Sequence, residues 1–295
     1  MKIRKAVIPV AGKGTRFLPA TKQVPKEMLP IVNKPMIHYA VEEAVNSGIE
    51  ELIFVTSSGK EAIENYFDRN QELEAFLKKN NKIEMMEDIQ RIGKMVEVVS
   101  VRQKEQLGLG HAINCARGLV GNETFAVILG DDLVLSDTPV TRQLIDVSER
   151  NEAKSVIGVM EVPRETTNKY GIVDGDFLKE DAKTLLMKQM VEKPSPEDAP
   201  TNLATPGRYI LNKEIFDCLD EIPKGVGGEY QLTDAINLLC SKDKVFAHIF
   251  TGDRFDTGSI AGYLNATVEF ALRDKKTRKI MEEIIKEKMK SYNLG

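Results

Sequence analysis

A glycine turn followed by widely spaced cations is the first feature of this chain that could do chemistry. The segment AVIPVAGKGTRFLPATKQVPKEMLP, residues 6–30, runs from an apolar stretch into Gly12 and Gly14 and then reaches Arg16 and Lys26. It matches neither the P-loop pattern nor the Gly-x-Gly-x-x-Gly dinucleotide pattern. Glycines let the backbone approach a phosphate closely and offer it amide groups. Cations spread along the following loop suit a row of anionic oxygens, so the segment indicates a triphosphate site.

Two acidic turns indicate a divalent cation near that loop. The block FAVILGDD ends in Asp131 and Asp132, and RFDTGS places Asp256 in a second strand-to-helix turn. Aspartate is also common in ordinary turns. Magnesium favours one or two carboxylates with substrate phosphates completing its octahedron. We therefore predict that Asp131 and Asp256 bind Mg2+, and that Asp132 is structural.

Two other strand ends carry side chains that fit a base and a sugar phosphate. The Gln103 amide can accept from uracil N3–H and donate to a ring carbonyl, and the backbone of Gly108 could add a contact. Because an amide can flip, Gln103 does not by itself exclude cytosine. In MVEKP, Glu192 could accept sugar hydroxyls while Lys193 meets a phosphate. Such a charged pair before a proline is also a common surface feature.

The remaining reactive residue types form no catalytic pattern. The three histidines lack ligand spacing, and the three cysteines are widely spaced without a C-x-x-C pair. These residues are His38, His111, His248, Cys115, Cys218 and Cys240. Odd, scattered cysteines are typical of reduced thiols rather than of disulfides or a zinc site. No apolar run is long enough to span a bilayer, so we expect a cytoplasmic protein without a membrane partner.

The charge balance gives no reason to expect nucleic acid as a partner. The 295 residues are 42% hydrophobic and 29% charged, which is typical of a globular protein, and the net charge is -4. Residues 1–30 nevertheless carry seven Lys or Arg side chains against one acidic residue, Glu27. A basic patch of this kind can be a plain solvated surface. On an acidic chain, anion binding must come from such local placement of cations.

Alternating apolar and amphipathic segments in the first half predict β-α-β units and a parallel sheet. Strands are expected at residues 5–10, 51–56, 96–101 and 124–129, and helices from Pro35 to a cap at Gly48 and over residues 60–68, 71–80 and 82–95. The last two helices are expected to form a peripheral insertion. Ligands bind outside the carboxyl ends of parallel strands. The glycine loop, the Gln103 segment and Asp131 all fall at such ends.

The pattern of the second half indicates a mixed or antiparallel sheet. Strands are expected in SVIGVMEVP, YGIVDGDFL, KTLLMKQMVEKP, GRYIL and KVFAHIFTGD, with a proline-rich loop at residues 194–206 and two helices after Ser259. No composition break marks a boundary, so we predict a single domain. It has a nucleotide-binding half at about residues 1–135, a sugar-phosphate half at about 136–258 and C-terminal helices at about 259–295.

An ordered set of blocks resembles a known family. AGKGTRFLPATK, PKEMLPI, RQKEQLGLGHA, FAVILGDD, KYGIVD, VEKP, GRYIL, GGEYQLTDAI and RFDTGS run in order from residue 11 to about residue 259. Together they resemble the bacterial UTP–glucose-1-phosphate uridylyltransferases, or UDP-glucose pyrophosphorylases, within the sugar-phosphate nucleotidyltransferases. The resemblance implies an α/β, Rossmann-like nucleotidyltransferase fold with a mixed, mostly parallel central sheet flanked by helices. It also implies Mg2+ dependence, and reversible formation of UDP-glucose and pyrophosphate from UTP and glucose 1-phosphate.

The resemblance also implies roles for individual positions. It assigns Ala11, Gly12, Gly14, Thr15, Arg16 and Lys26 to the nucleotide, Gln103 and Gly108 to uracil, Gly171, Glu192 and Lys193 to the sugar phosphate, and Asp131 and Asp256 to the metal. Arg16, Lys26, Asp131 and Lys193 are the expected catalytic residues, whereas Glu229 lies in a family motif without an assigned role. Self-association as a homodimer or homotetramer is implied, with the helix at residues 275–292 a candidate for the interface.

Chemistry at phosphorus needs positioning and charge neutralisation rather than a covalent group. The missing nucleophile is therefore expected. The sugar phosphate attacks the α-phosphorus in line, Mg2+ and Arg16 stabilise the departing pyrophosphate, and Lys193 holds the attacking group.

Several alternatives remain open at this stage. The chain lacks the usual Gly-Arg after its second strand, has Gln106-Leu107 in place of Pro-Lys, and has Pro206 before Gly207. A related hexose 1-phosphate, or a thymidylyltransferase activity, is therefore an alternative. A glycosyltransferase or a non-catalytic nucleotide-sugar binder belongs to a different class. Each of these two would bind a diphosphate, which leaves Arg16 and Lys26 without an evident purpose, so the cations argue against a glycosyltransferase and against a non-catalytic binder.

Overall fold

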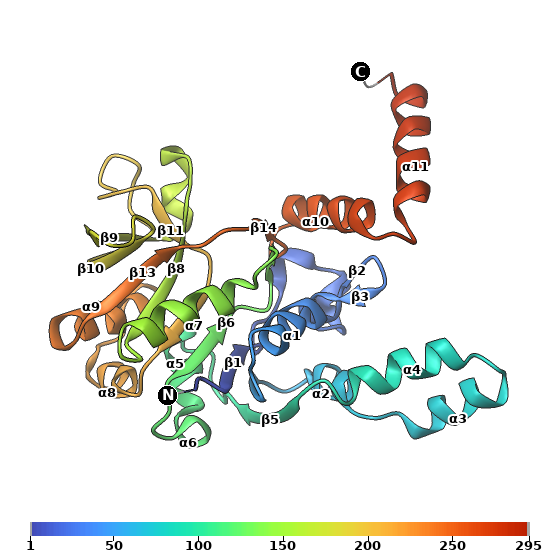
Figure 1. Cartoon of the computed structure of the whole chain (residues 1–295), viewed down its shortest axis with the longest axis horizontal. Coiled ribbons are helices and arrows are strands. Elements are labelled where there is room, and N and C mark those ends of the chain that lie inside the picture. The colour runs from blue at the N-terminus through green and yellow to red at the C-terminus, as the bar shows by residue number, and fades with distance from the viewer. Residues whose placement is uncertain (1, 294–295) are drawn as a thin grey trace.

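A mixed ten-stranded sheet forms the centre of the computed structural model, which describes residues 2–293 (Figure 1). The strands follow the order β11-β9-β10-β13-β8-β12-β6-β1-β4-β5 across the sheet. Their bounds are β1 Lys5–Pro9, β4 Glu51–Thr56, β5 Glu97–Arg102, β6 Phe125–Ile128, β8 Ser155–Glu161, β9 Gly171–Phe177, β10 Thr184–Glu192, β11 Leu203–Thr205, β12 Arg208–Leu211 and β13 Val245–Ile249. Separate two-stranded ladders join β2 (Pro30–Ile31) to β3 (Lys34–Pro35) and β7 (Asp132–Leu135) to β14 (Asp253–Asp256).

Helices pack on both faces of this sheet. The α-helices are α1 Met36–Asn46, α2 Glu61–Phe67, α3 Gln71–Lys79, α4 Ile83–Ile92, α5 Leu109–Cys115, α6 Arg117–Val120, α7 Val140–Arg150, α8 Glu214–Glu221, α9 Leu232–Lys242, α10 Ile260–Arg273 and α11 Arg278–Ser291. Short 3-10 turns are η1 Thr15–Phe17, η2 Ala20–Lys22, η3 Lys26–Met28, η4 Arg164–Lys169 and η5 Val226–Gly228. No helix within residues 2–293 has both the length and the apolar character needed to cross a membrane.

The pairing pattern confirms a mixed sheet. In the first half β1 runs parallel to both β4 and β6, and β4 runs parallel to β5. In the second half only β8 and β13 pair in parallel, whereas β9, β10, β11 and β12 pair antiparallel. Parallel pairing therefore dominates the first half alone. The expected strands of that half occur within one residue of their predicted bounds.

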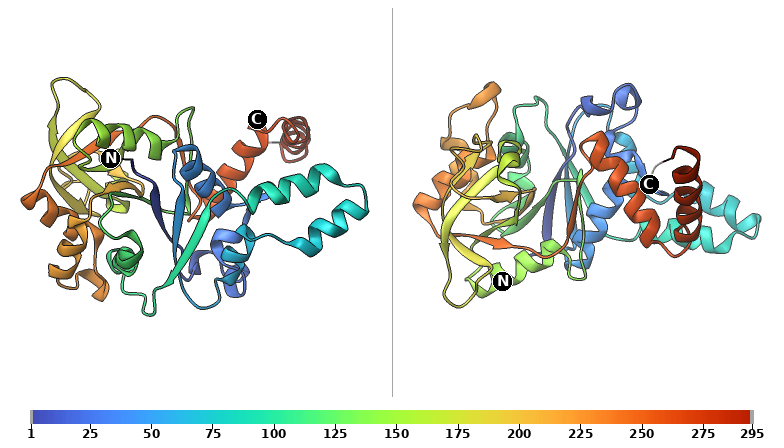
Figure 2. Two further views of the ribbon diagram at one scale, coloured as in Figure 1. Left: turned by 60° about the horizontal axis from the view of Figure 1, so that its bottom comes forward. Right: turned by 90° about the horizontal axis from the view of Figure 1, so that it is seen from above.

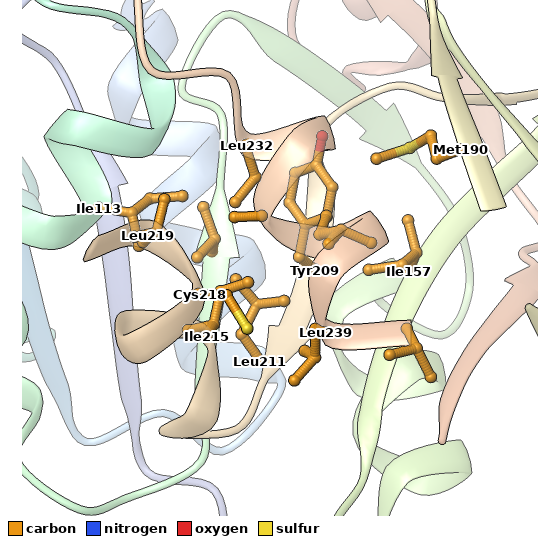
Figure 3. Packing of buried hydrophobic residues seen from close by; sticks show 14 of the residues in the cluster. Ile113, Ile157, Met190, Tyr209, Leu211, Ile215, Cys218, Leu219, Leu232 and Leu239 are labelled. Carbon is orange, nitrogen blue, oxygen red and sulfur yellow. The ribbon is translucent and has the colours of Figure 1, made fainter. Parts of the chain in front are cut away.

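Most of the core lies in two apolar layers, one on each face of the sheet, and a smaller cluster packs α10 against the β7–β14 ladder. Val7 of β1 belongs to one layer and Ile8 to the other, because successive side chains of a strand point to opposite faces. Figure 3 shows part of the first layer, where Tyr209 of β12 packs with Ile215 of α8 and Leu239 of α9. The continuous apolar run of β4 is buried because both of its faces are covered.

The structure contains elements that the sequence did not predict, among them the helices α5, α6, α7 and α8 and several short strands. Residues 203–205 of the expected proline-rich loop form β11, which pairs with β8 and β9. Prolines interrupt a helix, but the residues between them can still join a ladder. The strands β7 and β14, which pair with each other, were not predicted because neither DLVL nor DRFD is a continuous apolar run.

The peripheral helices lie at one end of the molecule. In Figures 1 and 2, α3 and α4 project from the end opposite to β9 and β10, and α10 and α11 lie towards the same end. The side chains of Ile280, Ile284 and Met289 on α11 are 57%, 45% and 46% exposed. This apolar stripe therefore does not pack on its own domain.

A buried ion pair ties α1 to the middle of the sheet. Arg208 of β12 is 1% exposed, and its Nη2 donates to Glu43 Oε2 at 2.8 Å. The same guanidinium donates to the backbone carbonyls of Leu129 and Asp132, at the ends of β6 and β7. Thr141 at the start of α7 donates to Glu43 Oε1 at 2.7 Å through its hydroxyl. These bonds hold the loop around Asp131 against the sheet.

We predict that Glu43→Gln lowers the free energy of unfolding by about 3 kcal/mol or more, because it leaves the buried Arg208 charge unpaired. Urea unfolding followed by circular dichroism measures the change. The matched control is Asp217→Asn, whose partner Arg117 is 43% exposed. An exposed pair contributes under about 1 kcal/mol. Equal losses for the two variants would contradict the prediction.

Candidate active site

One large cavity collects most of the predicted catalytic side chains. It has a volume of about 770 Å3 and lies beside the ends of β6, β10 and β14. The predicted residues that line it are Arg16, Asp131, Gly171, Glu192, Lys193 and Asp256, and Glu229 also lines it. Lys26 is not among the lining residues, but it contacts Asp131 directly. Cations and carboxylates from distant parts of the chain therefore share one space.

Lys26 and Asp131 form an ion pair at this cavity. Lys26 Nζ donates to Asp131 Oδ2 at 2.5 Å, and the two side chains are 20% and 26% exposed. Burial opposes both charges, but mutual attraction outweighs it, so the pKa of Lys26 is raised and the pKa of Asp131 is lowered. Glu27 also raises the pKa of Lys26. The sequence assigned Lys26 to phosphate and Asp131 to metal, whereas the structure pairs them with each other.

Asp131 and Asp256 face the same glycine. A Cβ atom built on Gly258 would lie 2.7 Å from Asp131 Oδ2 and 3.2 Å from Asp256 Oδ1. The antiparallel β7–β14 ladder explains this approach, since it places Asp256 opposite Asp132. Two carboxylates without a third protein ligand are the donor set that Mg2+ accepts when phosphates supply the other oxygens. These side chains therefore fit the predicted cation.

The glycine loop brings its cations to the same place. Gly14 has φ of 63°, and a Cβ atom there would lie 3.0 Å from the Cβ of Lys26, so glycine allows the turn to pack on Lys26. Thr15 and Arg16 follow in η1, and Arg16 Nη1 donates to the Gly258 carbonyl at 3.3 Å. No atom lies within 4 Å of a Cβ built on Gly12, so the backbone is open there.

The opposite wall of the cavity carries the predicted sugar-phosphate residues. Glu192 ends β10 directly opposite Gly171 of β9. A Cβ atom on Gly171 would lie 3.1 Å from the sulfur of Met190, which is tighter than an ordinary contact, so a side chain there would displace its neighbours. Lys193 has φ of 47°, a conformation that costs a non-glycine residue about 1 kcal/mol or more. Its ammonium lies 3.2 Å from Glu192 Oε1, and its backbone N–H donates to the Tyr170 carbonyl.

A second hollow of about 520 Å3 lies beside the glycine loop. Its lining includes Lys13, Ser57 and Gln103. The Ala11 carbonyl accepts from Ser57 Oγ and from Gln106 Nε2, at 3.2 and 2.6 Å, which joins the loop to this hollow. Leu109 lines the large cavity, so the chain from Gln103 to Leu109 runs from one space to the other.

The Gln103 amide is held within the protein. Its Nε2 lies 3.1 Å from the Gly108 carbonyl oxygen and 3.0 Å from His111 Nδ1. Gly108 has φ of 95°, and a Cβ atom there would lie 2.7 Å from the Cβ of Glu229, so only glycine fits. The expectation that the Gln103 amino group donates to a base is wrong, because the protein already occupies it. The Gly108 carbonyl likewise contacts Gln103.

Sequence reasoning missed two side chains that orient the predicted ones. Thr233 of α9 donates to Glu192 Oε2 at 2.6 Å, and Arg254 of β14 contacts both carboxylate oxygens of Asp132 at 2.5 and 2.6 Å. Arg254 also donates to the Tyr170 hydroxyl at 2.8 Å and lines the cavity. Burial raises the pKa of Asp132 to about 6, against the opposing effect of Arg254. Both residues lie in motifs that were recognised, but only the tertiary contacts reveal their roles.

Comparisons with known proteins show which family the chain resembles over almost its full length. The sequence pattern of the nucleotidyl transferase family matches residues 5–272. The UTP–glucose-1-phosphate uridylyltransferase of Staphylococcus haemolyticus is 51% identical over 286 residues, which are 97% of this chain and 98% of that protein. A UTP-bound UGPase from Acinetobacter baumannii is 43% identical with a TM-score of 0.90, covering 97% of this chain and 99% of that one. A UDP-glucose pyrophosphorylase complexed with UDP-glucose is 42% identical with a TM-score of 0.84, covering 92% and 100% of the two chains.

The fold and the matched pattern define an α/β nucleotidyltransferase with a central mixed sheet, as predicted. The chain is also about half identical in sequence to two uridylyltransferases over almost its full length, which narrows the class of enzyme. The chain belongs to the family of bacterial UTP–glucose-1-phosphate uridylyltransferases. The resemblance drawn from the ordered blocks is thereby confirmed.

We predict that Asp131→Asn lowers the free energy of unfolding at neutral pH, because the mostly buried Lys26 loses its partner. The pKa of Asp131 is lowered from 3.8 in the folded state. Its ionic contribution is thus fully present above that ordinary value and is lost as the pH falls through the folded-state pKa. The stability difference between the unsubstituted protein and the variant should be constant from about pH 5 to 8 and shrink below about pH 3.8.

Urea unfolding at several pH values measures this difference. The control is Asp137→Asn, which changes an exposed aspartate just beyond β7. A difference that stayed constant at acid pH would show that the Lys26–Asp131 charges do not cause the loss.

Proposed function

We propose that this chain transfers a uridylyl group from UTP to glucose 1-phosphate, giving UDP-glucose and pyrophosphate. One observation carries the proposal: Arg16, Asp131, Asp256 and Lys193 line a single cavity although they come from four separate segments. The proposal is also supported by the names of the relatives, which are uridylyltransferases of this kind. The volume of about 770 Å3 suits a ligand of nucleotide-sugar size.

In the proposed reaction the side chains position two anions and neutralise charge. Lys193 holds the phosphate of glucose 1-phosphate, and Glu192, oriented by Thr233, accepts sugar hydroxyls. Arg16 and Lys26 contact the β- and γ-phosphates of UTP, and open backbone at Gly12 lets the nucleotide approach the loop. An oxygen of the sugar phosphate then attacks the α-phosphorus in line, and pyrophosphate departs towards Arg16. No covalent intermediate with the protein is needed.

Asp131 and Asp256 are the residues we propose to hold Mg2+, because their carboxylates converge on Gly258. A bound divalent cation supplies positive charge that the transferring phosphates need. Lys26 pairs with Asp131 here, and a cation held by Asp131 would compete with Lys26 for that carboxylate and leave the lysine to phosphate oxygens.

We also propose that the protein self-associates as a homodimer or homotetramer. The exposed apolar stripe of α11 supports this proposal, and its mass in solution, compared with 33.0 kDa for one chain, tests it. The three cysteines are unpaired, which suits the reducing cytoplasm in which we propose that the protein acts.

The test of the function is pyrophosphate release. We expect release when UTP and glucose 1-phosphate are mixed with Mg2+ present, and none after chelation by EDTA. Parallel assays replace UTP with dTTP or glucose 1-phosphate with galactose 1-phosphate, since the contacts described do not separate uracil from thymine. Pyrophosphate release from UTP without any sugar phosphate, or no release at all, would exclude the proposed transfer.

We predict that Lys193→Met raises the KM for glucose 1-phosphate by roughly tenfold or more, while the KM for UTP changes less than about twofold. The reason is the loss of a charge-assisted contact to one substrate only, worth on the order of 1.5–3 kcal/mol. Initial-rate kinetics with each substrate varied in turn measure both constants.

The matched control is Lys188→Met in β10, the strand that precedes Lys193, where the lysine is 57% exposed and pairs with Asp176 outside the cavity. It should leave both KM values unchanged. An equal rise in the two KM values of Lys193→Met would remove Lys193 from the sugar-phosphate side.

A further inference from the structure

We propose that His111 is a positioning residue that makes Gln103 select uracil against cytosine. The inference rests on the proposed function and on Gln103 as the residue that contacts the base. It concerns one question that the sequence leaves open, namely which end of the Gln103 amide faces the nucleotide.

The Gly108 carbonyl determines the orientation of the amide. Gln103 is only 6% exposed, and its Nε2 lies 3.1 Å from the Gly108 carbonyl oxygen. A carbonyl oxygen only accepts hydrogen bonds. Flipping the amide would bring two oxygens without a proton to this distance. The amino group therefore points at Gly108 and the amide oxygen points elsewhere.

His111 accepts a hydrogen bond from the second hydrogen of the same Gln103 amino group. Its Nδ1 lies 3.0 Å from Gln103 Nε2 and must accept, because the donor is already defined. The ring proton then belongs on Nε2, which lies 3.9 Å from the sulfur of Cys115. Cys115 is four residues further along α5 and so lies on the same helix face. The ring also packs beside Tyr230, with centroids 6.3 Å apart.

The consequence is an acceptor presented to the base. With both amino hydrogens used, only Gln103 Oε1 remains, and no hydrogen bond within residues 2–293 uses it. Gln103 lines the hollow of about 520 Å3 beside the glycine loop. Uracil carries a proton on N3 and can donate to Oε1. Cytosine has a lone pair at N3 and would face a second lone pair, so it is disfavoured.

The same geometry does not separate uracil from thymine, because both carry the N3 proton. The Gln103 oxygen therefore distinguishes bases only by whether N3 carries a proton. Loss of His111 would leave one buried amino hydrogen of Gln103 unpaired, which weakens the preference for the native orientation.

The test compares His111→Leu with His111→Asn. Leucine removes the acceptor, whereas the asparagine Oδ1 stands where the imidazole Nδ1 stood and can accept from Gln103. Isothermal calorimetry measures UTP and CTP binding without requiring turnover. We expect the unsubstituted protein to prefer UTP, His111→Leu to lose at least tenfold of the UTP-to-CTP preference, and His111→Asn to keep it within about threefold.

A merely structural role would weaken both nucleotides together and leave their ratio unchanged, and that result would overturn the inference. So would an unsubstituted protein that binds UTP and CTP equally. If the UTP preference is found but no pyrophosphate is released with glucose 1-phosphate, the proposed function fails while the assignment of His111 stands.

A second measurement uses the unsubstituted protein, so it does not depend on whether His111→Leu folds. The 15N chemical shifts of the three histidine rings report their tautomers, and the spectrum of His111→Asn identifies the signals of His111. We expect a proton on Nε2 and none on Nδ1 in the neutral ring. A neutral His111 with its proton on Nδ1 would overturn the inference, because that nitrogen could no longer accept from Gln103.

Discussion

The repulsion between two polyanions is the constraint on which this structure depends. UTP and glucose 1-phosphate both carry negative charge, and at close range in a partly buried cleft the repulsion is much stronger than in bulk water. Cations from two distant segments offset this repulsion, namely Arg16 and Lys26 of the loop that follows β1 and Lys193 after β10. Their own mutual repulsion is offset by carboxylates, as the Lys26–Asp131 pair shows. The site therefore alternates charges of opposite sign along its walls, and the overall acidic composition of the chain does not prevent it from binding anions.

Such a site requires a rigid frame, because Coulomb interactions change steeply with distance. The frame is a second, deeper set of charges that touches no substrate in the proposed reaction. Glu43 and Arg208 lock α1 to β12, and Asp132 with Arg254 joins β7 to β14. Arg208 also donates to the Asp132 carbonyl, so the two pairs meet at one residue. Adjacent aspartates thus do different work, since Asp131 pairs with Lys26 at the cavity while Asp132 holds β7 against β14 through Arg254.

Much of the fold was predictable because the relevant signals are local. The apolar runs of β1, β4, β5 and β6 and the amphipathic pattern of α1 identify themselves within ten or so residues. The short strands β7, β11 and β14 escaped prediction since each is stabilised by a partner far away in the chain. For the candidate site, residue types at strand ends predicted the positions of Arg16, Asp131, Glu192 and Lys193. Thr233 and Arg254 lie in recognised motifs, but their hydrogen-bond partners Glu192 and Asp132 are distant in the chain, so their roles could not be predicted.

The sequence by itself determined the family, the strand-helix order of the first half and the set of charged side chains available for chemistry. These depend on residue type and spacing, which the chain carries directly. Only the tertiary structure decided which charges neutralise each other and which way the Gln103 amide points. Those outcomes depend on distances between segments that are far apart in the chain, such as the 105 residues between Lys26 and Asp131 and the 165 residues between Glu43 and Arg208. The spacing of residues along the chain does not predict these contacts, because hydrogen bonds and ion pairs depend on separation in space.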